Sequence, residues 1–365
     1  MKKTCLKHKS LYNDKMIHAM IMAGGRGTRF WPLSTRSKPK QFLSIIEEHT
    51  LLESTLRRLD PLIAPDKTWI LGSQDHEQWL KPFATIIPPD QLLLEPIGRN
   101  TAATIVWAAL ELVKKDPDAI MVVLPADHYI SPKPLFHDAL SKAVQLAQHE
   151  DVLVTIGISP DKPHTGYGYI ELGKEIATDV YDITAFHEKP SLEVAKTYIS
   201  SGQFLWNSGM FVWKATVILE VFQRFLPEHW RLLTALQCVE KNQTGAGDFA
   251  ELFSQFPAVS IDYGIMEKAT DCTRVITSHF EWSDIGSWAA LESFWKKDAN
   301  NNARYGNLIQ IDSFNNLIYS PSRTVTLVDV HDMIVVDSGD VIMIAKKSSD
   351  QRIKDLMTHL PEELL

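Results

Sequence analysis

The chain has 365 residues, of which 45% are apolar and 22% are charged, and its formal net charge is −8. The length suits one large domain with a smaller one, and the composition excludes a disordered, collagen-like or coiled-coil chain. The acidic balance argues against a protein dedicated to binding nucleic acid, because such proteins are basic.

The N-terminal residues 1–15 are basic, and no apolar segment follows that would make them a secretory signal. We predict a flexible extension over this stretch. No apolar run reaches the roughly 18 residues of a membrane span. The three cysteines have neither metal-site nor disulfide spacing. We therefore expect a cytoplasmic protein with no membrane and no nucleic acid among its partners.

In the first half of the chain, buried-strand patterns alternate with helical ones, which is typical of βαβ units and a mainly parallel sheet. The predicted strands are 17–22, 68–71, 91–94, 120–124 and 152–157, and the predicted helices are 51–59, 100–115 and 136–149. Ligands of such sheets bind beyond the carboxyl ends of the strands. The loops after Met22, Leu94 and Leu124 are therefore the first places to look for a site.

The rest of the chain is more mixed. We predict strands at 166–171 and 204–213, and helices at 192–200 and 217–225. From about residue 300, short β-rich runs (324–328, 333–336 and 341–345) follow one another closely, and one helix is predicted at 350–359. This pattern indicates a large α/β domain over residues 16–298 and a small β-rich domain over 299–365 that ends in a helix.

A glycine-rich loop, AGGRGTRFWP, follows the first predicted strand. Its three glycines allow backbone N–H groups to point at an anion, and Arg26 and Arg29 add donors that suit phosphate. The spacing excludes a P-loop and a dinucleotide fingerprint, because Arg29 and Phe30 stand where those motifs need glycine. Just downstream, Lys40 can neutralise charge in phosphoryl transfer, whereas Lys38 is better explained as part of a solvated turn.

Three further segments carry polar groups to strand ends or helix starts. Asn100 and Thr101 open a helix, where they can cap it or read a base edge. Asp127 directly follows a buried strand, where a carboxylate suits Mg²⁺. Asp284 is a candidate for the second Mg²⁺ ligand, and the alternative interpretation is that it caps the start of a helix. His128, beside Asp127, is interpreted as structural.

A last group of segments mixes amide, carboxylate and ammonium groups with aromatic residues and glycine. The segments are Thr165–Tyr169, Phe186–Pro190 and Trp206–Phe211. A sugar site needs this mixture, because hydroxyls need hydrogen-bond partners and the ring needs a flat apolar surface. Each segment alone is equally compatible with a plain turn or hairpin.

In this order, the segments resemble the sugar-1-phosphate nucleotidyltransferases, and most closely the branch that makes GDP-mannose. The similarity covers roughly Ile17 to the C-terminus and includes Ser260–Tyr263, Met266–Lys268 and Trp282–Trp288. The resemblance implies a Rossmann-like nucleotidyltransferase domain with a mixed sheet, and a small C-terminal β-helix-like domain. It also implies a homodimer, and a reaction in which mannose 1-phosphate attacks the α-phosphate of GTP in line, giving GDP-mannose and pyrophosphate.

The resemblance also implies residue roles. The catalytic residues would be Arg29, Lys40, Asp127 and Asp284, and the two aspartates would hold Mg²⁺. The nucleotide-binding residues would be Gly24, Gly25, Arg26, Gly27, Thr28, Gly98, Asn100 and Thr101. The sugar-phosphate-binding residues would be Gly168, Glu188, Lys189 and Asn207.

Two departures from the branch bear on these expectations. Ala126 stands where many members have serine, which we expect to tune activity rather than abolish it. Longer bacterial relatives append a phosphomannose isomerase domain, and because this chain ends at Leu365 we expect a single activity. Two alternatives stay open: the same chemistry with another nucleotide or sugar, and a silent relative that binds nucleotide sugar and regulates a partner.

Overall fold

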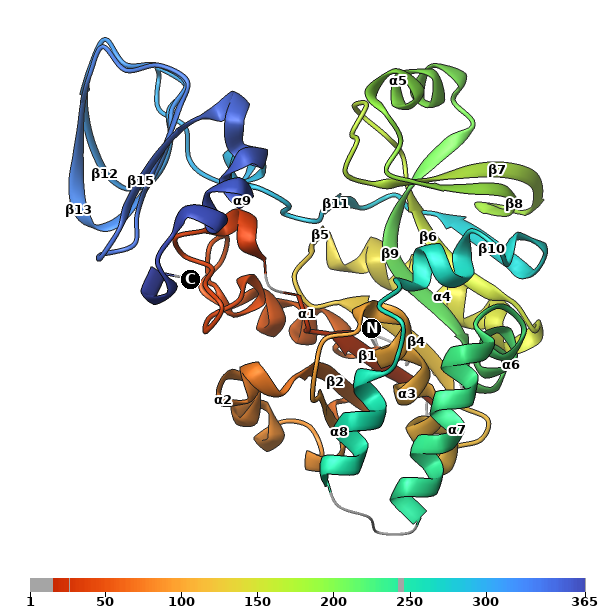
Figure 1. The fold of residues 1–365 in the computed structure, drawn as a ribbon. Helices are drawn as coiled ribbons and strands as arrows, with labels where there is room; N and C mark the ends of the chain where they lie inside the picture. The colour runs from red at the N-terminus through yellow and green to blue at the C-terminus, as the bar shows by residue number, and fades with distance from the viewer. Residues whose placement is uncertain (1–15, 26, 242–245, 365) are drawn as a thin grey trace, which may run out of the picture.

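The computed structural model describes residues 16–25, 27–241 and 246–364. The predicted extension over 1–15, with Cys5, lies outside the described residues, as does Arg26. Within the described part, nine strands form one large sheet, and a separate four-stranded sheet lies at the C-terminal end of the chain. Figure 1 shows this second sheet beside the α/β body.

The large sheet has the strand order β3-β2-β1-β4-β9-β6-β10-β8-β7. Its strands are β1 (Ile17–Met22), β2 (Thr68–Ser73), β3 (Leu92–Glu95), β4 (Ile120–Pro125), β6 (Leu153–Ile158), β7 (Gly168–Ala177), β8 (Val180–Glu188), β9 (Phe204–Lys214) and β10 (Thr273–Thr277). A small ribbon pairs β5 (Tyr129–Ser131) with β11 (Glu281–Ser283).

The sheet is mixed, as the resemblance implies. The alternation of strands and helices alone predicted a mainly parallel sheet, and this holds for β1 to β4, which pair in parallel. It is wrong for the other half, where β6 and β10 are the one parallel pair among the described strands and β9 runs antiparallel to both β4 and β6. In the parallel half, Met22 lies level with Pro125, and Ser73 with Glu95. The loops that follow β1, β3 and β4 therefore leave the same edge of the sheet.

The helices are α1 (Leu51–Leu59), α2 (Glu77–Leu80), α3 (Asn100–Lys115), α4 (Lys133–His149), α5 (Leu192–Ser201), α6 (Ala215–Phe225), α7 (Pro227–Lys241), α8 (Ala246–Ser254) and α9 (Ile353–Leu356). Helix α1 begins at a capping box, in which Thr50 and Glu53 bind each other's backbone N–H.

Successive residues of β1 point to opposite faces of the sheet. Met20 packs into the core beneath α3 and α6, whereas Ala19 and Ile21 pack into the core on the side of α1 and α4. The central strands are covered on both faces, which explains their continuous apolar runs. No helix in the described ranges has both the length and the apolar character needed to cross a lipid bilayer.

The C-terminal sheet has the order β12-β13-β14-β15. Its strands are β12 (Ala303–Ile311), β13 (Leu317–Val328), β14 (Met333–Asp337) and β15 (Ile342–Lys346), and the first three are parallel. A column of asparagines joins its turns. The buried Asn302 side chain accepts hydrogen bonds from the backbone N–H and side-chain amide of Asn316, which in turn accepts from the Met333 N–H.

The predicted terminal helix over 350–359 is wrong as a continuous element. The chain instead forms a 3₁₀ helix, η11 (Lys347–Arg352), then α9, then a second 3₁₀ turn at Met357–His359. A ten-residue helix is marginal in water, so contacts with the rest of the protein decide its shape. Here Ile353 is 4% exposed and packs with Phe30 and Trp31, which follow the glycine-rich loop.

Candidate active site

The glycine-rich loop leaves β1 at the edge of the sheet identified above. Gly24 and Gly25 line a cavity of about 440 Å³, together with residues that follow β3 and β4. Gly27 has a φ of 60°, and a Cβ there would overlap the Cβ of Lys40, so glycine is required at this position. Thr28 begins a short 3₁₀ helix, η2 (Thr28–Phe30), and lines a second cavity of about 330 Å³.

Lys40 lines this second cavity and is 4% exposed. Its Nζ lies 2.9 Å from Asp127 Oδ2 and donates a 2.5 Å hydrogen bond to the backbone carbonyl of Asp284. Burial alone would raise the pKa of Asp127, but the charge of Lys40 and its contact with the carboxylate lower this pKa below its usual value. The loop after β1 and the loop after β4 are thus joined by an ion pair with an ionised carboxylate.

Asp284 faces the same cavity as Asp127. It does not cap a helix, because it follows β11, and its Oδ1 accepts a 2.7 Å hydrogen bond from the Tyr167 hydroxyl. Arg29 lines this cavity too, and its Nη1 lies 3.5 Å from the Gly286 carbonyl oxygen. Four residues from three separate parts of the sequence therefore line one cavity, where phosphoryl chemistry was predicted: Arg29, Lys40, Asp127 and Asp284.

The donors around Asp127 and Asp284 fit a hard divalent cation. Together they offer carboxylate oxygens from two loops. The described ranges contain no cluster of three or more His, Cys, Asp or Glu that could hold a metal ion by protein ligands alone. Mg²⁺ is usually held in this way, with one or two carboxylates from the protein and the remaining positions filled by water and phosphate oxygens.

The first cavity also receives the start of α3, through Gly98, Asn100 and Thr101. Asn100 has a φ of 63°, and its Oδ1 accepts from the Thr101 N–H. Neither residue is the N-cap of α3: Arg99 holds that position without a side-chain cap. The Thr101 hydroxyl accepts a 2.8 Å bond from the Ile261 N–H, so it ties α3 to the segment that precedes Asp262.

Glu95, the last residue of β3, forms part of the same cavity and was given no role in the sequence analysis. Its side chain is buried, and burial raises its pKa to about 7 despite a hydrogen bond from the Thr104 hydroxyl. The other oxygen, Oε1, would lie 3.2 Å from a Cβ on Gly24. It therefore faces the glycine-rich loop. The sequence contained a signal sufficient to find Glu95, because it is a carboxylate at the end of an apolar strand and the same argument identified Asp127.

The four predicted sugar residues come together from three strands. Gly168 pairs with Glu188 across β7 and β8, and a Cβ on Gly168 would overlap Glu188 Oε2. Lys189 Nζ donates a 2.5 Å hydrogen bond to Glu188 Oε1, but Oε2 is buried and has no hydrogen-bond partner in the part of the chain that the structure describes. Asn207 Nδ2 donates a 2.9 Å bond to Asp262 Oδ1.

Asp262 connects this group to the first cavity, which it lines. Burial, followed by the charge of Glu188, raises the pKa of Asp262 to about 6. The residue begins a π-helical turn, Asp262–Met266, an irregularity that is frequent at functional sites. The sequence analysis quoted this segment but assigned it no role.

An aromatic wall completes the site on its other side. Tyr167 packs against Trp206 and Trp282, with ring centroids 5.0 and 5.1 Å away, and all three line a third cavity of about 800 Å³. His128 Nδ1 accepts from the Trp282 indole N–H, and burial lowers the pKa of His128 to about 4. His128 is therefore neutral near pH 7 and supports the wall.

The three cavities share lining residues. Asp127 and His128 line both the first and the second, and Arg29, Asp284 and Gly286 line both the second and the third. The site is thus a row of three pockets with the Lys40–Asp127 ion pair in the middle one. This row could hold an extended ligand with anionic groups near its centre.

Comparison with known proteins gives consistent matches. Residues 18–301 match the model of a family described as nucleotidyl transferase, and residues 306–360 match that of a mannose-phosphate isomerase/GMP-like β-helix domain. A putative mannose-1-phosphate guanylyltransferase of Vibrio cholerae is 37% identical over 95% of this chain and 75% of its own length. A mannose-1-phosphate guanylyltransferase of Klebsiella pneumoniae is 35% identical over 95% and 74%. A Thermus thermophilus crystal structure, described as a mannose-1-phosphate geranyltransferase, has a TM-score of 0.85 and 35% identity, over 94% of this chain and 99% of that one.

Proposed function

This chain belongs to the nucleotidyl transferase family, and we propose that it transfers GMP from GTP to mannose 1-phosphate, giving GDP-mannose and pyrophosphate. The family membership and the names of the relatives support this reaction. The observation that carries the proposal is the middle pocket. There Lys40, paired with Asp127, and Arg29 lie between a pocket lined by glycines and one lined by aromatic rings.

The glycine-lined pocket is assigned to the nucleotide. Gly24, Gly25 and Gly27 would present backbone N–H groups to the phosphates, together with Thr28 and with Arg26, which lies outside the described residues. Gly98, Asn100 and Thr101 would line the part of the pocket that holds the base. Guanine carries hydrogen-bond donors at N1 and N2, and the buried Glu95 side chain, whose Oε2 accepts from the Thr104 hydroxyl, offers Oε1 as a further acceptor in this pocket. This pairing favours guanine over adenine.

The transfer step requires no protein nucleophile. An oxygen of the sugar phosphate attacks the α-phosphorus of GTP, and the bond from that phosphorus to the bridging oxygen breaks, leaving its electron pair on pyrophosphate. Lys40 would stabilise charge at the α-phosphate and Arg29 would hold the pyrophosphate. Catalysis then rests on positioning and charge neutralisation, as in other phosphoryl transfers.

Nucleotidyl transferases of this family generally use a divalent metal. We assign Mg²⁺ to Asp127 and Asp284, whose carboxylates face one pocket with Lys40. A bound divalent cation polarises phosphate oxygens and shields their charge from the incoming nucleophile. The Tyr167 hydroxyl holds Asp284 in place by its hydrogen bond.

The sugar would bind between the aromatic wall and the group around Glu188. Glu188 Oε2 is a buried acceptor without a partner among the residues that the structure describes, and a sugar hydroxyl would satisfy it. Asn207 would contact a second hydroxyl, Lys189 would face the sugar phosphate, and Gly168 would leave room for the ring. The choice of mannose over other hexoses then depends on these hydroxyl contacts.

Two further assignments belong to this proposal. The chain would act as a homodimer through its C-terminal sheet, where Ile309, Ile311 and Val328 of β12 and β13 are each more than 60% exposed. Large exposed apolar side chains of this kind mark interaction surfaces. A cytoplasmic location would suit Cys238 and Cys272, which are both free thiols.

The reaction is tested by ³¹P NMR of the purified protein with GTP, mannose 1-phosphate and Mg²⁺. GDP-mannose and pyrophosphate should appear in equal amounts as both substrates disappear. Release of GDP and orthophosphate with the sugar phosphate untouched would contradict the proposal. No reaction, together with calorimetric binding of the nucleotide sugar, would instead favour a silent regulatory relative.

A further inference from the structure

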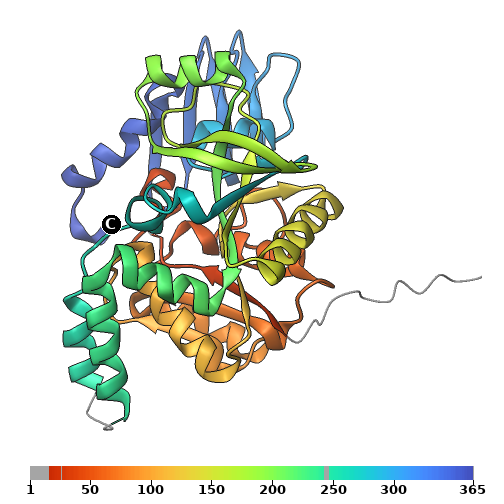
Figure 2. The same ribbon diagram turned by 90° about the vertical axis from the view of Figure 1, so that its right-hand side faces the viewer.

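The end of the chain returns to the phosphate side of the site. Helix α9 and the preceding η11 contact η2, the short turn that carries Thr28 and Arg29. Figures 1 and 2 show this from two directions, with the dark blue C-terminal segment lying against the red segment that follows β1. The C-terminal domain therefore touches the loop to which the phosphates are assigned.

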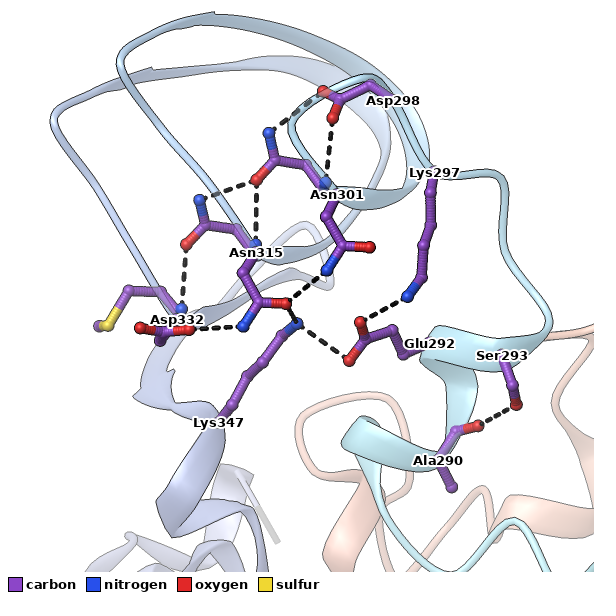
Figure 3. A network of polar contacts seen from close by, with 12 residues as sticks. Ala290, Glu292, Ser293, Lys297, Asp298, Asn301, Asn315, Asp332 and Lys347 are labelled. Atoms are coloured by element: carbon purple, nitrogen blue, oxygen red, sulfur yellow. Dashed lines mark hydrogen bonds and ion pairs between the residues drawn. The ribbon is translucent and has the colours of Figure 1, made fainter.

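Two anchors hold this segment in place. Lys347 Nζ lies 2.9 Å from Glu292 Oε2, on the turn Trp288–Ser293 of the large domain, and donates a 2.9 Å bond to Asn315 Oδ1 of the C-terminal domain. Figure 3 shows Lys347 between these two partners. At the other end, Ile353 is buried against Phe30 and Trp31. The backbone next to Lys354 is thus fixed from both domains.

Lys354 itself lines the middle pocket, together with Arg29 and Lys40. The three cations differ in what they already bind. Lys40 is paired with Asp127, and Arg29 lies near the Gly286 carbonyl oxygen. The Lys354 side chain is exposed, and among the described residues no hydrogen bond or ion pair engages it. It is an uncommitted positive charge at the mouth of a phosphate pocket.

We propose that Lys354 binds the terminal phosphates of the nucleotide and the pyrophosphate that leaves, so that the C-terminal domain completes the active site. The inference rests on the proposed function, because that reaction transfers an electron pair and its charge to pyrophosphate. The pocket contains the carboxylates of Asp127 and Asp284, which a polyanion must face. The positive charge of Lys354, added to those of Arg29 and Lys40, offsets the repulsion between these carboxylates and the polyanion.

The position of Lys354 favours pyrophosphate over the sugar phosphate as its ligand. Lys354 shares its pocket with Thr28 and Arg29 of the glycine-rich loop. It does not line the third pocket, where the aromatic wall lies. The contact should therefore affect pyrophosphate and GTP, and leave the apparent affinity for mannose 1-phosphate unchanged.

The test compares Lys354→Gln and Lys354→Arg with the matched control Lys346→Gln, which removes an exposed lysine on β15 outside the pocket. Calorimetry with Mg²⁺-pyrophosphate should show binding weakened about three- to tenfold by Lys354→Gln, restored by Lys354→Arg, and unaffected by the control. Pyrophosphorolysis of GDP-mannose should show the same rise in the KM of pyrophosphate. The loss should shrink as salt is raised, because an exposed charge is screened.

Equal pyrophosphate affinity in Lys354→Gln and Lys346→Gln would overturn the proposal, and so would a rise confined to the KM of mannose 1-phosphate. The calorimetric arm needs no turnover. If the unaltered protein is inactive with GTP and mannose 1-phosphate but Lys354→Gln still weakens pyrophosphate binding, the proposed function fails and the phosphate contact stands. If the protein is active and the variant binds normally, only the contact fails.

Discussion

The phosphate end and the sugar end of the candidate active site differ in how their buried carboxylates are satisfied. At the phosphate end, Lys40 is ion-paired with Asp127, and the pKa of Asp127 is lowered. At the sugar end, Glu188 keeps one buried oxygen that no described residue contacts by a hydrogen bond, and burial together with the charge of Glu188 raises the pKa of Asp262 to about 6. Each end contains a lysine paired with a carboxylate, but the sugar end also keeps a buried carboxylate oxygen with no hydrogen-bond partner among the described residues.

This difference matches what each end would bind. A triphosphate brings negative charge, so its pocket needs cations held rigidly in place, and a lysine fixed by a carboxylate provides this. A sugar brings neutral hydroxyl donors, so its pocket needs acceptors that water cannot easily satisfy. The substrate then completes the hydrogen bonding of the sugar end, whereas the phosphate end is organised in advance.

The largest expected effect comes from the phosphate end. Lys40→Met should lower kcat by about 10²- to 10³-fold, because the charge at the α-phosphate loses its stabiliser. Steady-state kinetics with saturating GTP and mannose 1-phosphate would measure it. Lys38→Met is the matched control, since Lys38 lies over the Trp79 ring rather than in the pocket. Equal activity of the two variants would remove Lys40 from the reaction.

At the sugar end, Glu188→Gln should raise the KM of mannose 1-phosphate about tenfold or more and leave the KM of GTP nearly unchanged. A charged acceptor contributes about 1.5–3 kcal/mol to a hydrogen bond, and an amide replaces it poorly. Glu193→Gln on α5 is the control, because this exposed side chain pairs with Lys196 in its own helix and lies outside the pocket. A parallel rise in both KM values would show that the two ends are not separate.

The nucleotide pocket gives a pH-dependent prediction. The folded protein raises the pKa of Glu95 from 4.5 to about 7 by burial, so the folded state holds this proton more tightly than the unfolded state. The stability from this group is fully present below pH 4.5 and is lost as the pH rises through about 7. Relative to the unaltered protein, Glu95→Gln should therefore gain stability across this window, by at most about 3 kcal/mol.

Thermal unfolding of the ligand-free proteins between pH 4.5 and 8 would measure this gain. Glu193→Gln should show a difference from the unaltered protein that does not change with pH. A Glu95→Gln difference that stays flat over the same range would mean that Glu95 ionises normally.

The smallest effect on chemistry is expected from the C-terminal sheet, which belongs to neither end. Ile311→Asp places a charge on an exposed apolar strand and should shift the protein from dimer to monomer in sedimentation velocity. Its kcat should change less than twofold. A dimer that persists in Ile311→Asp would place the interface elsewhere.

Local patterns were sufficient for much of the fold. The apolar runs of β1 and β4 and the helical spacing of α3 gave these elements close to their observed bounds. The direction of a strand could not be predicted in this way, because a buried strand shows the same apolar run whether it pairs in parallel or antiparallel. The antiparallel placement of β9 depends on contacts distant in sequence.

The candidate site shows the same division. Glycines and charged residues that follow a strand, such as Gly27 and Asp127, were readable from their local context. The bond from Tyr167 to Asp284 joins residues 117 positions apart, and no spacing rule predicts it. Glu95 was readable, because it ends an apolar strand. The contact of Lys354 with the phosphate pocket was not, because it depends on how the second domain folds back.

The most direct test of separate recognition at the two ends is kcat/KM over a grid of four nucleoside triphosphates and the 1-phosphates of mannose, glucose and N-acetylglucosamine. The unaltered protein, Glu95→Gln and Glu188→Gln would each be measured. The account predicts a maximum at GTP with mannose 1-phosphate, a flatter nucleotide preference in Glu95→Gln, and a flatter sugar preference in Glu188→Gln. A maximum elsewhere, or either variant flattening both preferences, would contradict it.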